Sequence, residues 1–270
     1  MPTAFFAGPG PRVFGHRGAG GLAPENTLPS FALSLALGAD VLEFDVHTSR
    51  DGAIVVIHDA TLERTTNAGG AVRDRALYDL QQLDAGYHFS RDGHDFPYRG
   101  QGVRIPTLEG VLRCFPLAYC NIEIKQADPP MVAEVINVIR RLDAQHRVLL
   151  AAEQDAIMQD IRVHAADIPT SFSVGEVVDF VGRIHASDFT GYRPAGRALQ
   201  IPPRHNSIEL VSAESVAVAH RCGLEVHVWT INQRDEMERL LALGVDGIMS
   251  DLPGLLRTVV DAGRTRASTD

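Results

Sequence analysis

Two apolar segments of the chain carry acidic side chains at a spacing that suits metal binding. In the segment 41–46, Glu43 and Asp45 are two residues apart, so a strand would place both carboxylates on one face and the apolar residues on the other. The segment 120–125 adds Glu123 in the same way. Carboxylates buried together repel one another, and a hard divalent ion such as Mg²⁺ or Ca²⁺ would stabilise them. For the first segment alone, a face that is exposed to solvent or paired with arginine is the alternative.

Cationic and glycine-rich features accompany these acidic segments. His16 and Arg17 end a predicted strand and are followed by a glycine-rich loop, whose backbone could approach an anion closely. Lys125 lies on the same predicted face as Glu123 and is the only lysine among the 25 lysine and arginine residues. A flexible ammonium group differs from a planar guanidinium group, so we interpret Lys125 as a contact for phosphate or carboxylate, with chance retention as the alternative.

Histidines close two of the predicted strands. His58 ends the apolar run 54–58, and His16 ends the run 13–16. On the rim of a barrel, strand ends are where groups that transfer protons are expected. Either histidine alone would more often be structural. Together with three carboxylates and two cations, they predict a site for acid–base chemistry.

The elements that position these residues follow an alternating pattern. Short apolar runs alternate with segments of helical period, which is typical of repeated βα units and a parallel sheet. Eight runs are predicted as strands, about the number that a closed barrel requires. These runs are 13–16, 41–46, 54–58, 120–124, 148–152, 170–173, 208–211 and 225–230. We therefore expect an α/β fold, a TIM-type β/α barrel that forms a single domain over residues 1–270.

Helices are predicted between several of these strands. The first begins at Leu28, with Asn26 or Thr27 as its N-cap and Gly38 just beyond its end. The same design recurs at 131–142, 156–166, 213–220 and 234–243.

Three segments depart from the pattern. The connection between Asp45 and Ile54 is too short for a crossover helix, so one connection of the barrel must be irregular. The segment 59–104 is rich in Gly, Asp and Arg and is predicted to be a small insertion after the third strand, where we expect substrate specificity to lie. Residues 264–270 form a polar tail, which we expect to be frayed.

Composition narrows the classes of function. The formal net charge of −9 argues against nucleic acid or an anionic membrane as a partner. No apolar run approaches the length of a spanning helix, so no integral membrane association is expected. The start of the chain lacks the pattern of a secretory signal, and the three cysteines lack metal-type spacing. We expect reduced thiols in a cytoplasmic protein.

Seven ordered segments give the chain a family resemblance. It resembles the glycerophosphodiester phosphodiesterase family, also called glycerophosphoryl diester phosphodiesterase. The matching segments are His-Arg-Gly at 16–18, Ala-Pro-Glu-Asn-Thr at 23–27, Gly-Ala-Asp-Val-Leu-Glu-Phe-Asp-Val at 38–46, His-Asp-Ala-Thr-Leu-Glu-Arg-Thr-Thr at 58–66, Asn-Ile-Glu-Ile-Lys at 121–125, Val-Trp-Thr-Ile-Asn at 228–232 and Gly-Val-Asp-Gly-Ile-Met-Ser-Asp-Leu-Pro at 244–253. The stretch 127–206 matches only loosely, and Ser250 stands where the family usually has threonine.

The resemblance implies roles for eight residues. Glu43, Asp45 and Glu123 would hold one divalent metal ion, and His16 and His58 would act as acid and base. Arg17 and Lys125 would face the phosphate, and Trp229 would line the pocket near the alcohol. By contrast, Glu25 and Asn26 are interpreted as helix start and loop bracing, with catalysis as the alternative. Asp246 and Asp251 are interpreted as residues of the barrel rim, with a contact near the site as the alternative. Arg64 is close enough in sequence to His58 to merit testing.

The expected activity is hydrolysis of a small-molecule glycerophosphodiester, such as glycerophosphocholine or glycerophosphoethanolamine, to glycerol 3-phosphate and an alcohol. One alternative is a lysophospholipase D that acts on single-chain lipids. It would need an apolar groove in the insertion, which contains Tyr78, Tyr87, Phe89, Phe96 and Tyr98. The other alternative is a non-catalytic barrel that binds phosphodiesters. The preferred alcohol, the native metal and the oligomeric state are left open.

Overall fold

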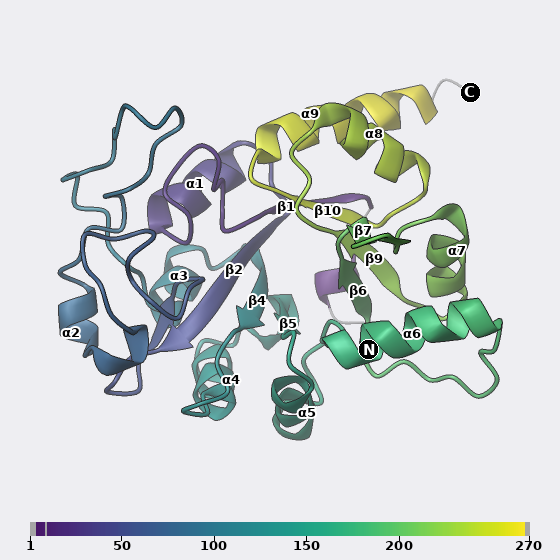
Figure 1. Cartoon of the computed structure of the whole chain (residues 1–270), viewed down its shortest axis with the longest axis horizontal. Coiled ribbons are helices and arrows are strands. Elements are labelled where there is room, and N and C mark those ends of the chain that lie inside the picture. The colour runs from purple at the N-terminus through teal and green to yellow at the C-terminus, as the bar shows by residue number, and fades with distance from the viewer. Residues whose placement is uncertain (1–3, 9, 268–270) are drawn as a thin grey trace.

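Seven parallel strands form a curved sheet at the centre of the computed structural model, which describes residues 4–8 and 10–267 (Figure 1). Their order is β5, β4, β2, β1, β10, β9 and β6, and each neighbouring pair is parallel. The strands are β1 (Arg12–Gly15), β2 (Val41–Thr48), β4 (Tyr119–Ile124), β5 (Val148–Ala151), β6 (Ala198–Ile201), β9 (Glu225–Val228) and β10 (Gly247–Ser250).

A short segment closes this sheet into a barrel. Thr170 forms a parallel bridge with Leu150 of β5, and Ser171 forms a parallel bridge with Ala198 of β6. The segment thus takes the place of an eighth parallel strand between β5 and β6, although it contains only isolated bridges. The predicted TIM-type β/α barrel is confirmed.

Two of the predicted strands lie outside the barrel. The strand β3 (Ile54–Val56) pairs antiparallel with the end of β2, because the connection after β2 is too short to return in parallel. The predicted run 208–211 contains β8 (Ile208–Glu209), which pairs only with β7 (Arg204–His205) in an exposed hairpin. These two assignments to the barrel were wrong.

The sequence pattern missed β6 and β10. Both strands have only four residues, and a glutamine interrupts the apolar run of β6 while glycine and serine flank that of β10. Both strands lie mostly or wholly buried between neighbours, so their position is set by the tertiary structure.

Helices surround the sheet (Figure 1). The predicted helices are confirmed to within two residues at either end. They are α1 (Leu28–Ala36), α4 (Val132–Arg141), α5 (Asp155–His164), α7 (Ala213–Arg221) and α8 (Arg234–Ala242), while α3 (Leu108–Cys114), α6 (Val174–Ala186) and α9 (Pro253–Ala267) were not predicted. Short 3-10 helices are η1 (Ala4–Phe6), η2 (Val72–Asp74) and η3 (Gln145–Arg147). Throughout the described ranges, every helix is too short or too polar to span a bilayer.

Helix ends follow ordinary capping chemistry. Thr27, rather than Asn26, caps α1, since its hydroxyl accepts the amide hydrogen of Ser30. Ser173 and Glu176 form a capping box at the start of α6. At the other end of the chain, α9 continues into the polar tail as far as Ala267. Residues 264–267 of the expected tail are thus helical, and 268–270 lie outside the described residues.

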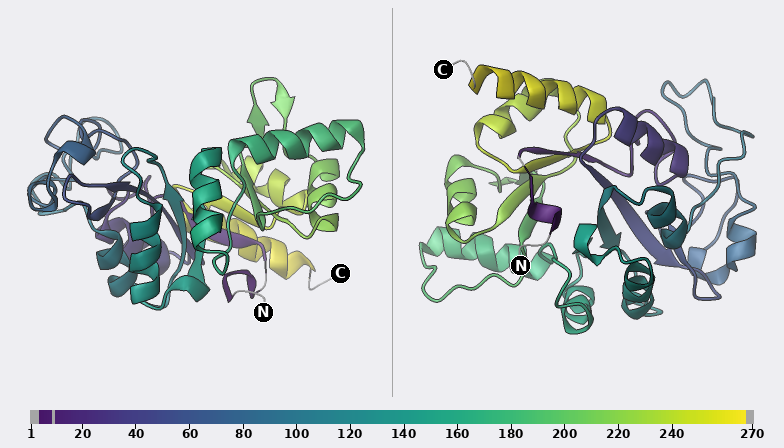
Figure 2. Two further views of the ribbon diagram at one scale, coloured as in Figure 1. Left: turned by 90° about the horizontal axis from the view of Figure 1, so that it is seen from below. Right: turned by 180° about the vertical axis from the view of Figure 1, so that it is seen from behind.

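The segment 59–104 after β3 forms a small unit beside the barrel. It contains η2 and α2 (Leu77–Leu80), and it buries Leu62, Val72 and Leu80 in an apolar cluster of its own with Val55 of β3. Figure 1 places α2 at one edge of the molecule and α6 near the opposite edge, and Figure 2 (left) shows the β7–β8 hairpin projecting above α6. The insertion and α6 therefore flank the barrel from opposite sides.

Candidate active site

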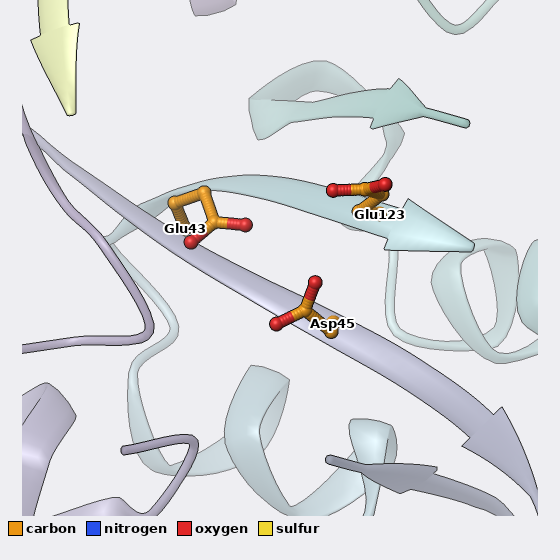
Figure 3. Close-up of side chains that lie close together, drawn as sticks. All are labelled: Glu43, Asp45 and Glu123. Atoms are coloured by element: carbon orange, nitrogen blue, oxygen red, sulfur yellow. The ribbon is translucent and has the colours of Figure 1, made fainter. Parts of the chain in front are cut away.

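Strands β2 and β4 bring three carboxylates together. On β2, Leu42, Phe44 and Val46 belong to the outer apolar core, so Glu43 and Asp45 must face the barrel interior. Asp45 is paired in register with Glu123 of the parallel strand β4. Each of the three residues offers an oxygen, and these oxygens all lie within 4.8 Å of one another (Figure 3). The predicted convergence of Glu43, Asp45 and Glu123 is confirmed.

Burial opposes the ionisation of all three carboxylates in this cluster. Glu43 is 3% exposed, and burial together with repulsion from Asp45 raises its pKa to about 7. Burial likewise raises the pKa of Glu123. Burial also opposes ionisation of Asp45, but Lys125, His58 and Arg17 outweigh it and lower its pKa. An oxygen-binding divalent ion fits this donor set because it would offset the remaining repulsion.

Two cations face the acidic cluster. Lys125 Nζ donates to Glu123 Oε1 at 2.8 Å and lies 3.5 Å from Asp45 Oδ1. The backbone amide of Arg17 donates to Glu43 Oε2 at 2.8 Å, and its Nε lies 3.6 Å from Asp45 Oδ2. Arg17 adopts a left-handed backbone conformation with φ of 51°, which non-glycine residues adopt uncommonly. This turn points both the amide and the guanidinium of Arg17 at the carboxylates.

Each of the two histidines rests against a carboxylate. His16 follows β1, and its Nδ1 lies 2.7 Å from Oδ1 of Asp251, which follows the neighbouring strand β10. His58 Nδ1 lies 2.6 Å from Asp59 Oδ1. Burial opposes protonation of His16, but the hydrogen bond to Asp251 and the charge of Glu43 outweigh it, so the pKa of His16 is raised. With Nδ1 occupied in both rings, Nε2 is the nitrogen left for a substrate.

A cavity of about 570 Å³ unites these groups. All eight residues singled out from the sequence line it. They are His16, Arg17, Glu43, Asp45, His58, Glu123, Lys125 and Trp229. An arrangement with an acidic cluster, two cations and two imidazoles around one space can bind a phosphate and move protons on either side of it.

The chain is similar to known proteins over most of its length. The model of the glycerophosphoryl diester phosphodiesterase family matches residues 16–255. A glycerophosphodiester phosphodiesterase of Caldanaerobacter subterraneus is 30% identical, with 93% of this chain and 98% of that protein covered. A phosphodiesterase structure from Oleispira antarctica, in complex with the product sn-glycerol-3-phosphate, has a TM-score of 0.75 and 27% identity, with 93% and 97% of the two chains covered. The lysophospholipase D GDPD1 of Mus musculus is 26% identical, with 91% and 85% covered.

The chain belongs to the glycerophosphoryl diester phosphodiesterase family. It is therefore an enzyme of the phosphoric diester hydrolase class, and the site described above lies within the part of the chain that the family model covers.

Four polar residues of this family member support the site more closely than their sequence context indicated. Asp251 and Asp59 hold the histidines, as described above. Asn26, with φ of 58°, donates through Nδ2 to Asp45 Oδ2 at 3.0 Å, and Glu25 Oε1 accepts from Arg17 Nη1 at 2.8 Å. Besides their expected place at the helix start and in the loop, Glu25 and Asn26 thus both contact residues of the cavity. Their place inside the matching segments was the signal that could have found them.

One wall of the cavity of this phosphodiesterase is apolar. It is formed by α6 and by residues around the β7–β8 hairpin, namely Val174, Val177, Val178, Val181, Ile201, Pro202, Ile208 and Leu210. None of residues 59–104, all of which the structure describes, lines the cavity. In the insertion, Arg99 instead stacks on the rings of Tyr87 and Phe96. The lysophospholipase D alternative required an apolar groove in the insertion, whereas the apolar wall of this cavity lies on α6 and around the β7–β8 hairpin.

Proposed function

We propose that the protein hydrolyses glycerophosphodiesters, such as glycerophosphocholine or glycerophosphoethanolamine, to glycerol 3-phosphate and an alcohol. The observation that supports this most directly is the pairing of His16 with Asp251 and of His58 with Asp59 at one cavity that also holds three carboxylates and two cations. The Oleispira antarctica relative with bound sn-glycerol-3-phosphate supports the same product.

Glu43, Asp45 and Glu123 would hold one divalent ion, Mg²⁺ or Ca²⁺. Such an ion supplies Lewis-acid stabilisation of charge that grows on the phosphoryl oxygens. Arg17 and Lys125 would contact the non-bridging oxygens. Three carboxylates, a divalent ion and these two cations leave one positive charge, which a single phosphodiester anion neutralises. The charge of the site therefore suits a diester substrate.

The two imidazoles would divide the proton transfers. One removes a proton from the attacking hydroxyl as its oxygen bonds to phosphorus, and the other protonates the alcohol oxygen as its bond to phosphorus breaks. The carboxylates of Asp251 and Asp59 hold Nδ1 of His16 and His58, and so present Nε2 to the substrate. The attacking group is either water or a hydroxyl of the glycerol, which would give a cyclic phosphate. Phosphorus NMR of the products separates these two routes.

The test is a substrate panel assayed after chelation and after single-metal add-back. We expect release of choline or ethanolamine together with glycerol 3-phosphate, lost on chelation and restored by Mg²⁺, Ca²⁺ or Mn²⁺. Absence of hydrolysis of every glycerophosphodiester with each metal would contradict the proposal.

A second candidate is lysophospholipase D activity. The apolar wall favours it, because Val178 is 66% exposed and Ile208 is 48% exposed beside the cavity, where a single acyl chain could cover them. The relative named lysophospholipase D in Mus musculus supports the same candidate. Comparing kcat/KM for lysophosphatidylcholine and glycerophosphocholine decides between the two. A preference for glycerophosphocholine by several orders of magnitude would exclude the lipid as the main substrate.

We further propose that residues 1–270 form one domain, that the protein acts in the cytoplasm and that nucleic acid is not a partner. Contacts of α9 with β1 and β10 join the end of the chain to the barrel. The cysteines Cys114, Cys120 and Cys222 are all free, and the net charge is −9. Sedimentation and fractionation of the native host cells would test whether the protein lies in the cytoplasm.

A further inference from the structure

Arg64 does not line the cavity, yet its guanidinium joins two carboxylates that stand behind the site. Its Nη1 and Nη2 donate to Glu25 Oε2 and Oε1 at 2.6 and 2.8 Å. Its Nε and Nη2 donate to Asp59 Oδ2 and Oδ1 at 2.6 and 3.1 Å. One planar group thus binds all four carboxylate oxygens.

Each of these carboxylates also binds a residue of the cavity. Asp59 Oδ1 lies 2.6 Å from His58 Nδ1, and Glu25 Oε1 accepts from Arg17 Nη1 at 2.8 Å. Two short chains of contacts therefore run from the guanidinium of Arg64. One leads through Asp59 to the imidazole of His58, and the other leads through Glu25 to the guanidinium of Arg17. The positions of His58 and Arg17 relative to each other depend on this shared point.

The members of this network come from two separate parts of the chain. Glu25 lies in the loop before α1, whereas Asp59 and Arg64 both belong to the insertion after β3. The insertion holds the backbone around Arg64 in place. The side chain of Leu62 is fully buried, and Thr66 Oγ1 donates to the carbonyl oxygen of Leu62 at 2.8 Å. Although the insertion does not line the cavity, it thus reaches the site through the side chains of Asp59 and Arg64.

The chemistry of the contacts favours arginine over lysine. The hydrogen bond from Arg64 is the largest of the causes that lower the pKa of Asp59 to about 2. Burial opposes ionisation of Glu25, but Arg64 and Arg17 outweigh it and lower its pKa. Both carboxylates thus remain ionised acceptors. A planar fork with several donors can serve two carboxylates at once, whereas an ammonium group is a point charge.

We propose that Arg64 is a positioning residue, which fixes His58 and Arg17 relative to one another through Asp59 and Glu25. This rests on the proposed function of His58 and Arg17. The Arg64 side chain is 45% exposed, so its pairs contribute little to the stability of the fold. Its loss should therefore affect turnover more than unfolding.

The experiment compares Arg64→Ala and Arg64→Lys with Arg73→Ala as the matched control. Arg73 lies in the same insertion, its side chain is 52% exposed, and it pairs with Asp128 at 3.3 Å. For Arg64→Ala we expect kcat on glycerophosphocholine to fall by about 10- to 100-fold, the order that slight misplacement of reacting groups costs, and KM to rise through Arg17. Arg64→Lys should recover little, and Arg73→Ala should match the wild type.

Chemical rescue separates positioning from general damage. Guanidinium ion, at concentrations too low to unfold the protein, should restore part of kcat in Arg64→Ala, and sodium chloride of equal ionic strength should not. Wild-type kcat in Arg64→Ala, an equal loss in Arg73→Ala or absence of rescue would each overturn the proposal.

A crystal structure of Arg64→Ala gives an outcome that needs no substrate. Displacement of the His58 or Arg17 side chain supports the proposal, and unchanged placement of both overturns it. If the wild type hydrolyses no glycerophosphodiester, the proposed function fails, and this structure still decides the role of Arg64.

Discussion

The two sides of the cavity are built in different ways. The polar side carries its side chains on barrel strands or directly after them. His16, Glu43 and Asp45 each have a hydrogen-bond partner, and Glu123 is paired in register with Asp45 on the neighbouring strand. The apolar side consists of α6 and the β7–β8 hairpin, where Val178 and Ile208 are exposed.

This difference separates chemistry from selectivity. A parallel ladder fixes the relative height of Asp45 and Glu123, so the polar side has little freedom to vary without loss of the barrel. The wall of α6 is held by helix packing and contributes surface, not reacting groups. We infer that changes on the polar side alter turnover of every substrate, and that changes on the apolar side alter the choice among substrates.

The largest expected effect tests whether the histidines on the polar side contribute to kcat while a histidine on the apolar side does not. His16→Ala and His58→Ala should each lower kcat by about 10²- to 10⁴-fold, the range for loss of a proton-transfer group. His205→Ala removes an exposed imidazole of β7 that lines the same cavity and should leave kcat for glycerophosphocholine close to wild type. Equal rates in all three variants would remove the assignment of acid and base.

The next effect concerns the carboxylate behind His16. Asp251→Asn should lower kcat by about 10- to 100-fold, because the amide no longer stabilises the protonated ring or selects its orientation. Asp246→Asn is the control, since that carboxylate binds His220 and the Val226 amide instead of a residue of the cavity. Steady-state kinetics together with thermal unfolding would measure both. If Asp246→Asn lost as much kcat, Asp251 would have no special link to His16.

A smaller effect tests the apolar wall. If that wall binds an acyl chain, Val178→Asp should lower kcat/KM for lysophosphatidylcholine by about 10-fold, the scale of losing one buried apolar side chain. Hydrolysis of glycerophosphocholine should change little. Val163→Asp, at an exposed position on α5 that does not line the cavity, is the control. Equal changes for both substrates would erase the proposed difference between the two sides.

The smallest effect concerns the start of α6, which carries the wall. Glu176 accepts from Arg162 Nη2 at 2.9 Å and from the Ser173 amide at 2.9 Å. Burial opposes its ionisation, but these hydrogen bonds outweigh burial, so its pKa is lowered in the fold. A lowered pKa means that ionised Glu176 stabilises the fold above the unfolded-state pKa of about 4.3 and that this contribution is lost as pH falls through the lower folded-state value.

Glu176→Gln should therefore reduce the free energy of unfolding by about 0.5–2 kcal/mol near pH 7, as loss of a cap does, and by less at pH 3. Denaturant unfolding at both pH values measures this. Glu238→Gln, in an exposed pair with Arg234 on α8, should cost less at pH 7. A reduction for Glu176→Gln that is the same at pH 3 and pH 7 would contradict the assigned role of its charge.

The strengths and failures of the sequence predictions have physical causes. Helices such as α4 and α8 were predicted well because their apolar periodicity is local. The run 208–211 looks like a buried strand, yet in the fold its first two residues form part of an exposed hairpin and only Val211 is buried. Conversely, β10 was missed because four residues with a glycine and a serine carry too little pattern, and its neighbours β1 and β9 decide its conformation.

The sequence by itself determined the alternation that puts Glu43 and Asp45 on one face of a strand, the residue types of the site and the family resemblance. Only the tertiary structure decided that Asp251 reaches His16, that Arg64 joins Asp59 to Glu25, and that α6 supplies the apolar wall. Periodicity is a property of neighbouring residues, whereas these contacts join positions up to 235 residues apart. Barrel closure and the path of each loop bring them together, and neither can be read from local spacing.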